Sequence, residues 1–358
     1  MFYCPEDIFQ AGGGATVAKN ILKHFKSHEK DLIIFSTRTI IPHEIESNFK
    51  TIKVWYPKST VLRVLYDFFL APLILLFFYR ERVVCLNSLV PLFYPFRIEV
   101  FFQMRMFHFE ELDTIQKKIK NILGKFSIKR CKYVYVASKD HQKDLINSLK
   151  INTNKVIVAY LGFDSELIIS KNKNKLIDSN KYWVFISVFR PYKNLDGLIE
   201  SYGILSKEDV QIPNLIIVGD YPKDYRNIES YKFRINKLME KYDLKNKVNF
   251  LGLKTHPEAM SYLKYSSLFI FPTKFEGFGL PLLEAMSLGI PVICSSCHSL
   301  PEIGQDTIQY FDTNIKNDLY FKLKDYNKNG YKKNLNSALI RSKYFTWDKT
   351  CNVILENN

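Results

Sequence analysis

A framework of several cysteine pairs is absent from this chain of 358 residues. Its six cysteines are scattered among apolar neighbours, and only Cys294 and Cys297 lie close together in the sequence. No second pair and no nearby cluster of histidines and cysteines completes a zinc site, and a disulfide framework would need several spaced pairs. We therefore expect free, buried thiols and a reducing compartment.

We expect neither a secretory leader nor a membrane-spanning run. Residues 1–7 are partly acidic and do not contain the apolar segment of a signal peptide. The longest apolar run, residues 68–79, is too short to cross a bilayer, which takes roughly 20 residues. We expect a cytoplasmic protein in which this run forms a buried helix. The alternative is a peripheral patch at the cytoplasmic face of the membrane, flanked by Arg63, Arg80 and Arg82.

Acidic residues are the minority charge, since 36 Asp and Glu stand against 51 Lys and Arg, a formal net charge of +15. Such an excess suits an anionic partner. The basic residues are spread over both halves of the chain, without an arginine-rich block or a recognisable nucleic-acid-binding module. We therefore expect solvated lysines first, an anionic membrane surface second, and no nucleic-acid partner.

The sequence does contain a regular alternation of β-prone apolar runs with helical patterns. Its length favours two domains, and an apolar content of 47% is enough for two full cores. The stretch 170–181 is polar, charged and nearly free of apolar residues, and we predict a linker at 166–181. We predict an α/β fold of two doubly wound, Rossmann-like domains that face each other across a cleft. They would span 1–165 and 182–340, with a C-terminal helix at 341–358 that packs back toward the first domain.

Two carboxylates stand out in the segment 271–296. An apolar run ends at its start, glycines follow at Gly277 and Gly279, and a helical pattern leads to a second apolar run. The order is strand, glycine loop, helix and strand, with the loop at the carboxyl end of the first strand, where open α/β sheets bind ligands. We expect Glu276 in that loop and Glu284 in the first turn of the helix.

This environment indicates the chemistry of a ligand. A helix N-terminus offers free N–H groups to an anion such as a diphosphate, and a carboxylate accepts hydrogen bonds from a neutral diol. A ligand that is part phosphate and part polyol, such as a nucleotide sugar, satisfies both. The alternative is that Glu284 is only a helix-dipole partner and Glu276 a solvated loop residue.

A second cluster follows the predicted strand 182–189. Arg190 and Lys193 lie in the turn after it, and Asn194 suits the N-cap of the next helix. Two cations beside a helix N-terminus form a second anion site, with surface salt bridges as the alternative. Gly12–Gly14 adds a glycine-rich loop in the first half, and the three features converge best on a diphosphate.

These motifs resemble those of a known family. The segment 275–286, with Gly289-Ile-Pro-Val after it, is similar to the Glu-x7-Glu signature of family 4 glycosyltransferases. These are retaining enzymes of the GT-B fold that use nucleotide sugars, here of the polysaccharide and lipopolysaccharide biosynthesis type. Other family motifs are matched in order by Gly12–Gly14, Phe163-Asp164, 190–194, 248–252, 300–303 and 345–349.

The resemblance implies roles for individual residues. Glu284 would hold the ribose hydroxyls of the donor, and Glu276 the hydroxyls of the transferred sugar near the reaction centre. Lys193 and Arg190 would neutralise the leaving group. Backbone groups that meet the diphosphate or the sugar would be those of Gly13, Gly14, Gly277, Phe278, Gly279 and Leu280.

Two positions depart from the family pattern. The family places its arginine five residues before the lysine, where this chain has Val188, so Arg190 would act from a different angle. The family's active-site histidine in the first domain has no clean counterpart. Gln103 takes the nearest position, and Arg105 and His108 would lie on the acceptor side.

The implied reaction is the retaining transfer of a hexose from a UDP- or GDP-sugar to a hydroxyl of a glycan or lipid-linked saccharide, without a cofactor. The sequence has no Asp-x-Asp pair, so we expect a metal-independent reaction in which protein cations stabilise the leaving diphosphate. The acceptor would attack from the leaving-group face, with a covalent intermediate on Glu276 as the alternative. A non-catalytic subunit that binds nucleotide or membrane, a nucleotide-sugar epimerase and a GT-B phosphorylase remain open.

Overall fold

The computed structural model describes residues 1–4, 13–25, 32–36, 41, 43–57, 59–78, 82–86, 90–91, 93–102, 115–163, 182–209, 211–222 and 227–357. The chain forms two compact units, of which the first comprises Met1–Gly162 and Thr346–Asn358 and the second Phe163–Phe345. The chain therefore passes to the second unit at Phe163, close to the predicted end at 165. The predicted linker, 166–181, lies outside the described residues.

The first unit contains a seven-stranded parallel sheet with the order β3-β2-β1-β4-β5-β6-β7. The strands are β1 (Phe2–Cys4), β2 (Leu32–Ser36), β3 (Lys50–Val54), β4 (Arg82–Cys85), β5 (Arg97–Phe102), β6 (Tyr133–Val136) and β7 (Val156–Val158). The direction of the chain order reverses between β1 and β4, which makes the sheet doubly wound.

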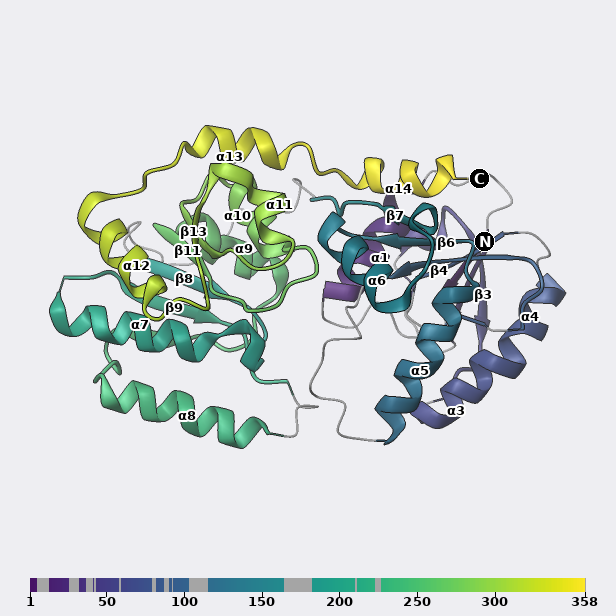
Figure 1. Ribbon diagram of the computed structural model, residues 1–358, viewed down its shortest axis with the longest axis horizontal. Coiled ribbons are helices and arrows are strands. Elements are labelled where there is room, and N and C mark those ends of the chain that lie inside the picture. Colours follow the sequence, from purple (N-terminus) through teal and green to yellow (C-terminus); the bar gives the residue numbers. More distant parts are fainter. Residues whose placement is uncertain are drawn as a thin grey trace. The chain divides into compact units, whose positions relative to one another are not determined.

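Helices cover both faces of this sheet (Figure 1). They are α1 (Gly13–His24), α2 (His43–Glu46), α3 (Thr60–Leu65), α4 (Ala71–Phe78), α5 (Ile115–Arg130), α6 (Lys139–Leu149) and α14 (Trp347–Glu356), with the short 3-10 turn Thr153–Lys155 before β7. The π-helical turn η1 (Tyr66–Leu70) joins α3 to α4, so residues 60–78 form one continuous helical segment. Helices α4, α5 and α6 share a core with the central strands, to which Leu75, Ile128 and Leu145 contribute.

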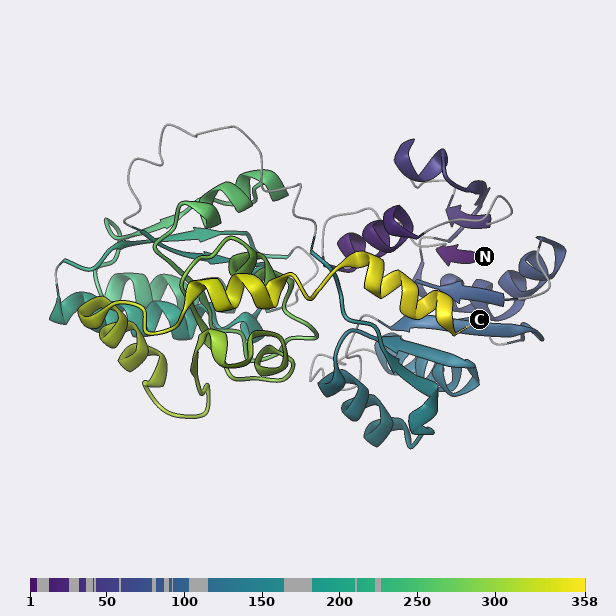
Figure 2. The same cartoon turned by 90° about the horizontal axis from the view of Figure 1, so that it is seen from above.

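The C-terminal helix α14 belongs to the first unit and packs against α1, as Figure 2 shows. The Thr350 hydroxyl donates to the Tyr160 carbonyl at 2.5 Å, and the Cys351 thiol to the Ile21 carbonyl at 3.4 Å. At the end of the helix, Arg82 donates to the Ile354 carbonyl. The predicted helix at 341–358 is therefore wrong in its start, because α13 (Leu335–Ser342) ends in the second unit and α14 begins separately at Trp347.

The predicted buried helix at 68–79 is only half correct. Its inner side is buried at Phe68, Ala71 and Leu75, whereas Leu73 and Phe77 are 62% and 84% exposed. A continuous apolar run does not reveal which side of a helix faces the core, because it has no polar stripe to mark the outer side. Among the described residues, no helix is long and apolar enough to cross a bilayer.

The second unit contains a six-stranded parallel sheet with the order β10-β9-β8-β11-β12-β13. The strands are β8 (Tyr182–Ile186), β9 (Asn214–Val218), β10 (Val248–Phe250), β11 (Leu268–Phe271), β12 (Val292–Ser295) and β13 (Gln309–Phe311). Strands β11 and β12 are buried along their whole length, which explains why their sequences, LFIF and VICS, are almost continuously apolar.

Two groups of helices cover this sheet (Figure 1). One group contains α7 (Leu195–Glu208), α8 (Ile228–Lys241) and α12 (Asp318–Asn329), which contact each other through α7. The other contains α9 (His256–Lys264), α10 (Leu280–Ser287), α11 (Leu300–Gly304) and α13, which gather around α10. The 3-10 turns Pro191–Lys193 and Gln305–Thr307 complete the described elements of the unit.

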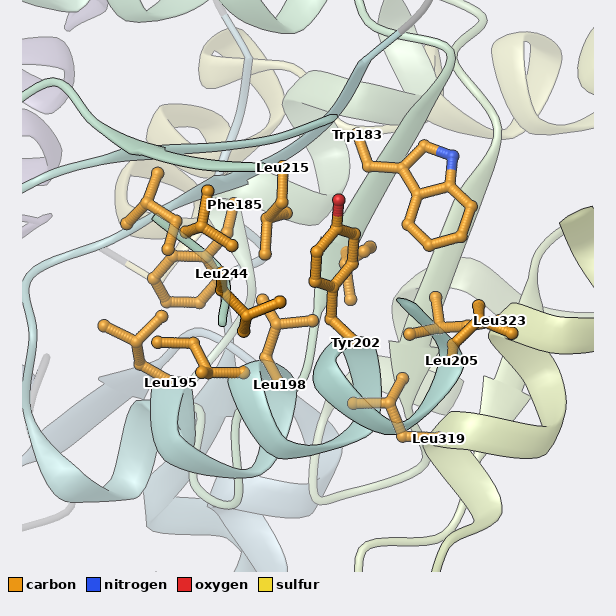
Figure 3. Packing of buried hydrophobic residues seen from close by; sticks show 14 of the residues in the cluster. Trp183, Phe185, Leu195, Leu198, Tyr202, Leu205, Leu215, Leu244, Leu319 and Leu323 are labelled. Atoms are coloured by element: carbon orange, nitrogen blue, oxygen red, sulfur yellow. The ribbon is translucent and has the colours of Figure 1, made fainter. Parts of the chain in front are cut away.

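The core between α7 and the sheet is drawn in Figure 3. Tyr202 rises from α7 and meets Trp183 of β8 edge to face, with ring centroids 5.9 Å apart, and its hydroxyl donates to the Pro213 carbonyl at 2.8 Å. Leucines complete this core: Leu195, Leu198 and Leu205 from α7, Leu215 from β9, and Leu319 and Leu323 from α12. This packing fixes the start of α7, and with it the loop between β8 and α7.

The expectation of free thiols is confirmed, because none of the six cysteines takes part in a disulfide. Five of them are buried, and Cys297 is half-buried. Burial raises the pKa of Cys131 to about 12 and that of Cys351 to about 12. These thiols therefore act as small apolar side chains.

Candidate active site

The predicted site residues of the second unit follow two strands at the switch point of its sheet. The chain order of the strands reverses between β8 and β11, which are neighbours in the sheet. Lys193 follows β8 and Glu276 follows β11, so both lie at the carboxyl ends of these strands. Ligands of doubly wound sheets bind outside the carboxyl ends at such a point.

Lys193 and Glu276 form an ion pair there. Lys193 Nζ lies 2.7 Å from Glu276 Oε2, and the side chains are only 15% and 16% exposed. Burial lowers the pKa of Lys193, but the charge of Glu276 and its hydrogen bond raise it more, so the net shift is upward. The ammonium also lies 5.4 Å from the ring centroids of Tyr192 and Phe271. This lysine is a fixed cation.

Backbone hydrogen bonds join the two loops that carry the pair. The Lys274 N–H and the Thr273 hydroxyl both donate to the Tyr192 carbonyl, at 2.7 and 3.1 Å. From the loop after β12, the buried Ser299 hydroxyl reaches the Phe278 carbonyl at 3.2 Å, and the Ser295 hydroxyl donates to the Thr273 carbonyl at 2.5 Å. The glycine loop after β11 is thus held from both neighbouring strands, which preorganises the site.

Asn194 differs from its predicted role as a side-chain cap of α7. It stands at the N-cap position but in the left-handed conformation, with φ 58°, and its side chain makes no capping hydrogen bond. Its amide instead donates to the Pro272 carbonyl at 3.1 Å. A Cβ on Gly197 would lie 2.5 Å from the Asn194 side chain, so a glycine leaves room for this bridge. Asn194 therefore connects the two loops.

The glycine loop leads directly into α10. The Gly277 N–H donates to Glu276 Oε1 at 3.2 Å, and Phe278 is buried against Phe345. Gly279 is the N-cap residue with φ 104°, where a Cβ would come within 2.6 Å of the Leu300 side chain. A residue with a side chain would be strained there. The helix begins at Leu280, and this N-terminal end of α10 offers backbone N–H groups to an anion.

Glu284 is not in the first turn of α10, as predicted, but is its fifth residue, because the helix begins at Leu280 rather than at Pro281. Its Oε1 lies 2.8 Å from His256 Nε2. Glu284 is 14% exposed and His256 41% exposed. His256 opens α9 after β10, and sequence reasoning missed it because 28 residues separate it from its partner. The only local signal is its position after a strand.

The remaining predicted residues are placed less fully. Arg190 directly precedes the 3-10 turn Pro191–Lys193, and its carbonyl accepts the Lys193 N–H at 2.8 Å. Val188, which stands where the family has its arginine, is exposed. Gly13 and Gly14 form the first residues of α1 in the first unit. Outside the described residues lie Gly12, Gln103, Arg105, His108 and Asp164.

Comparison with known proteins agrees with this picture. Residues 168–330 match the family model described as glycosyl transferases group 1. The O-antigen chain mannosyltransferase B of Escherichia coli is 30% identical over 196 residues, which cover 52% of this chain and 49% of that protein. The O-antigen chain mannosyltransferase RfbU of Salmonella typhimurium is 27% identical over 272 residues, covering 74% and 69%. The match thus spans about half the length of the Escherichia coli relative.

A solved structure extends the likeness of fold to the whole chain. The crystal structure of Anabaena Alr3699/HepE in complex with UDP has a TM-score of 0.75 at 16% sequence identity, covering 99% of this chain and 98% of that one. Two doubly wound parallel domains are the architecture of the GT-B fold. The match of residues 168–330 to the group 1 family model, together with these two relatives, supports the resemblance to family 4 glycosyltransferases.

Proposed function

We propose that the protein transfers a hexose from a UDP- or GDP-sugar to a hydroxyl of a glycan or lipid-linked saccharide, with retention of configuration and without a metal ion. The main support is the Lys193–Glu276 pair at the switch point, beside the N-terminus of α10. A cation, a carboxylate and free N–H groups within one braced loop system match a donor that is part diphosphate and part sugar.

The pair suggests how the donor enters. Without a donor, Lys193 and Glu276 neutralise each other. An arriving diphosphate attracts the ammonium, and the sugar offers its hydroxyls to the carboxylate, so each partner exchanges one charged contact for the ligand. Glu284 then accepts hydrogen bonds from the ribose diol. Arg190 adds a second positive charge beside the leaving group.

The reaction breaks the bond between the anomeric carbon and the diphosphate oxygen, and forms a bond from that carbon to the acceptor oxygen. The acceptor attacks from the leaving-group face, and its proton passes to the departing diphosphate oxygen. Lys193 and the α10 N–H groups stabilise the negative charge that develops on that oxygen. The configuration at the anomeric carbon is retained because attack and departure occur on the same face.

The comparisons suggest which donors to try first. Two relatives are named as O-antigen chain mannosyltransferases, which makes GDP-mannose the first candidate. The Anabaena structure contains UDP, so UDP-hexoses are the second group. An O-antigen chain is a saccharide, and such a saccharide on a lipid carrier would place the reaction at the cytoplasmic face of the membrane.

The test is to measure the consumption of each nucleotide sugar with extracted lipid-linked saccharides as acceptors. We expect one donor to be consumed with release of its nucleoside diphosphate and with a glycosylated product whose new linkage keeps the donor's anomeric configuration. Tight nucleoside diphosphate binding without turnover of any donor would instead indicate a non-catalytic subunit. Turnover without an acceptor, giving a changed sugar, would indicate an epimerase, and turnover that needs inorganic phosphate a phosphorylase.

A further inference from the structure

The helical segment 60–78 and helix α5 expose an unusual number of large apolar side chains. On the segment they lie at intervals of three or four residues, which places them on one side of the helix. We call the set the apolar face: Leu62, Leu65, Phe69, Leu73 and Phe77 on the segment, Phe93 after β4, and Ile122 and Phe126 on α5, all between 48% and 84% exposed. Soluble monomers rarely leave such a continuous apolar surface in water.

A buried carboxylate fixes which side of the segment faces outward. Asp67, in the π-helical turn, accepts hydrogen bonds from the Tyr3 hydroxyl at 3.0 Å and the Tyr56 hydroxyl at 2.7 Å. Asp67 is 1% exposed and therefore lies on the inner side of the helix. Rotating the helix to bury the outer stripe would break both of these hydrogen bonds. Ala71 and Leu75 anchor the same inner side in the core. The fold therefore fixes the outward orientation of this apolar stripe.

The parts of the apolar face are physically connected. The rings of Phe69 and Phe93 stack with centroids 6.0 Å apart. The loop of Phe93 is tied to α5, because Ser127 donates to the Val90 carbonyl at 3.3 Å and Arg130 donates to the Tyr94 carbonyl at 2.7 Å. Helices α3 and α5 are also in direct contact (Figure 1). The face thus extends over two helices and the loop between them.

The sequence of helix α5 carries charge of one sign only. Helix α5 has no acidic residue and contains six basic ones, Lys117, Lys118, Lys120, Lys125, Lys129 and Arg130. Two of the three arginines predicted to flank the apolar run interact with other groups of the protein. Arg63 donates to the Pro57 carbonyl at 2.9 Å, and Arg82 pairs with the buried Glu99 at 2.7 Å. Arg80 lies outside the described residues.

We propose that the apolar face, with the basic residues of α5, docks on an anionic bilayer surface. Exposed phenylalanine and leucine side chains enter the boundary of the acyl chains, and Lys125 and Lys129 meet anionic headgroups. A second copy of this chain is the poorer occupant, because a symmetric contact would bring two acid-free α5 helices together. Docking would bring a lipid-linked acceptor to the enzyme. Only this purpose of the docking rests on the proposed function.

The test is flotation of the full-length protein with vesicles of phosphatidylcholine containing phosphatidylglycerol, beside vesicles of phosphatidylcholine alone. We expect binding to the anionic vesicles that weakens with salt. The double variant Leu73→Ser/Phe77→Ser should lower binding at least tenfold. Lys125→Gln/Lys129→Gln should lower it about fivefold for each charge removed near the surface. The first variant removes apolar side chains and the second removes charges. The apolar and the electrostatic contributions to vesicle binding are therefore measured separately.

Matched variants on the second unit provide controls. Phe321→Ser/Ile340→Ser removes two comparably exposed apolar side chains, and Lys245→Gln/Lys343→Gln removes two exposed lysines. These should bind vesicles like the wild type. Absence of wild-type binding at low salt, or equal losses in the controls, would overturn the docking inference. So would a concentration-dependent dimer that Leu73→Ser/Phe77→Ser dissociates.

A second measurement separates this inference from the proposed function. Nucleoside diphosphate binding by calorimetry and nucleotide-sugar consumption with a soluble saccharide acceptor should be the same in all four variants. If vesicle binding fails while donor consumption persists, only the docking inference is lost. If vesicle binding is confirmed while no donor is ever consumed, the proposed function fails and the docking surface stands.

Discussion

Lys193 and Glu276 form their 2.7 Å ion pair across the two loops at which the strand order of the second sheet reverses. Neither side chain has much access to water, and both belong to loops that are fixed by backbone hydrogen bonds. A ligand with both acidic and hydroxyl groups could replace this ion pair: its acidic group would meet the ammonium of Lys193, and its hydroxyls would meet the carboxylate of Glu276. We expect removal of either partner to destabilise the donor-free protein, because it would leave the other charge largely buried and unpaired.

The first prediction concerns turnover. Lys193→Ala should raise the activation barrier by about 2–4 kcal/mol, the usual scale for losing one preorganised charge-stabilising group. Arg190→Ala should have a smaller effect, because Arg190 stands three residues before Lys193 rather than five. Steady-state kinetics with the identified donor measures both. Lys274→Ala removes an exposed lysine of the neighbouring loop and should leave kcat unchanged. Wild-type kcat in Lys193→Ala would remove this cation from the mechanism.

The second prediction concerns the stability of the same pair. Lys193→Ala alone leaves a largely buried carboxylate without its cation, so the free energy of unfolding should fall by about 3 kcal/mol, and Glu276→Ala alone should have a similar effect. The double variant should lose less than the sum of the two, with a coupling of about 1–3 kcal/mol. Urea unfolding of the four proteins measures the cycle. Strict additivity would mean that the two charges do not interact in solution.

How far the sequence predicts this structure depends on how local each signal is. The loop between β11 and α10 follows from neighbouring residues, because Gly279 supplies the left-handed backbone and Pro281 suits a helix start. The partners of Asn194 and Glu284 lie 78 and 28 residues away in the sequence, and no local pattern reveals them. The sequence does not reveal which side of the segment 60–78 faces outward, because the burial of Asp67 sets this orientation.

The third prediction concerns the nucleoside part of the donor. Glu284→Gln should weaken nucleoside diphosphate binding by about 1.5–3 kcal/mol, because a charged acceptor of the ribose hydroxyls becomes neutral. The fold should tolerate this change, since glutamine has the same shape and still reaches His256. Calorimetry measures the affinity and thermal unfolding the stability. Glu240→Gln, at an exposed position of α8, is the matched control. Unchanged affinity in Glu284→Gln would refute the ribose assignment.

The fourth prediction concerns His256, which orients one oxygen of Glu284 at 2.8 Å. The wild type should bind a ribonucleoside diphosphate more tightly than its 2′,3′-dideoxy analogue, because only the former offers a diol. His256→Ala should reduce this ratio several-fold, and His256→Gln should restore part of it. His43→Ala, an exposed histidine of the first unit, should leave the ratio unchanged. A preserved ratio in His256→Ala would show that Glu284 needs no partner.

The last prediction concerns metal ions. The proposed reaction places Lys193, Arg190 and the N–H groups at the start of α10 around the leaving diphosphate, and these groups together supply the charge that a divalent cation provides in other enzymes. Donor consumption should therefore continue in excess chelator, with kcat changed less than twofold. Lys193→Ala offers a sharper check, because removal of a protein cation makes an external one more useful. Its residual activity should rise with Mn²⁺ or Mg²⁺, whereas that of the wild type should not. Loss of wild-type activity in chelator, with recovery on adding Mn²⁺, would show instead that the protein's own cations are insufficient and that the donor enters as a metal complex.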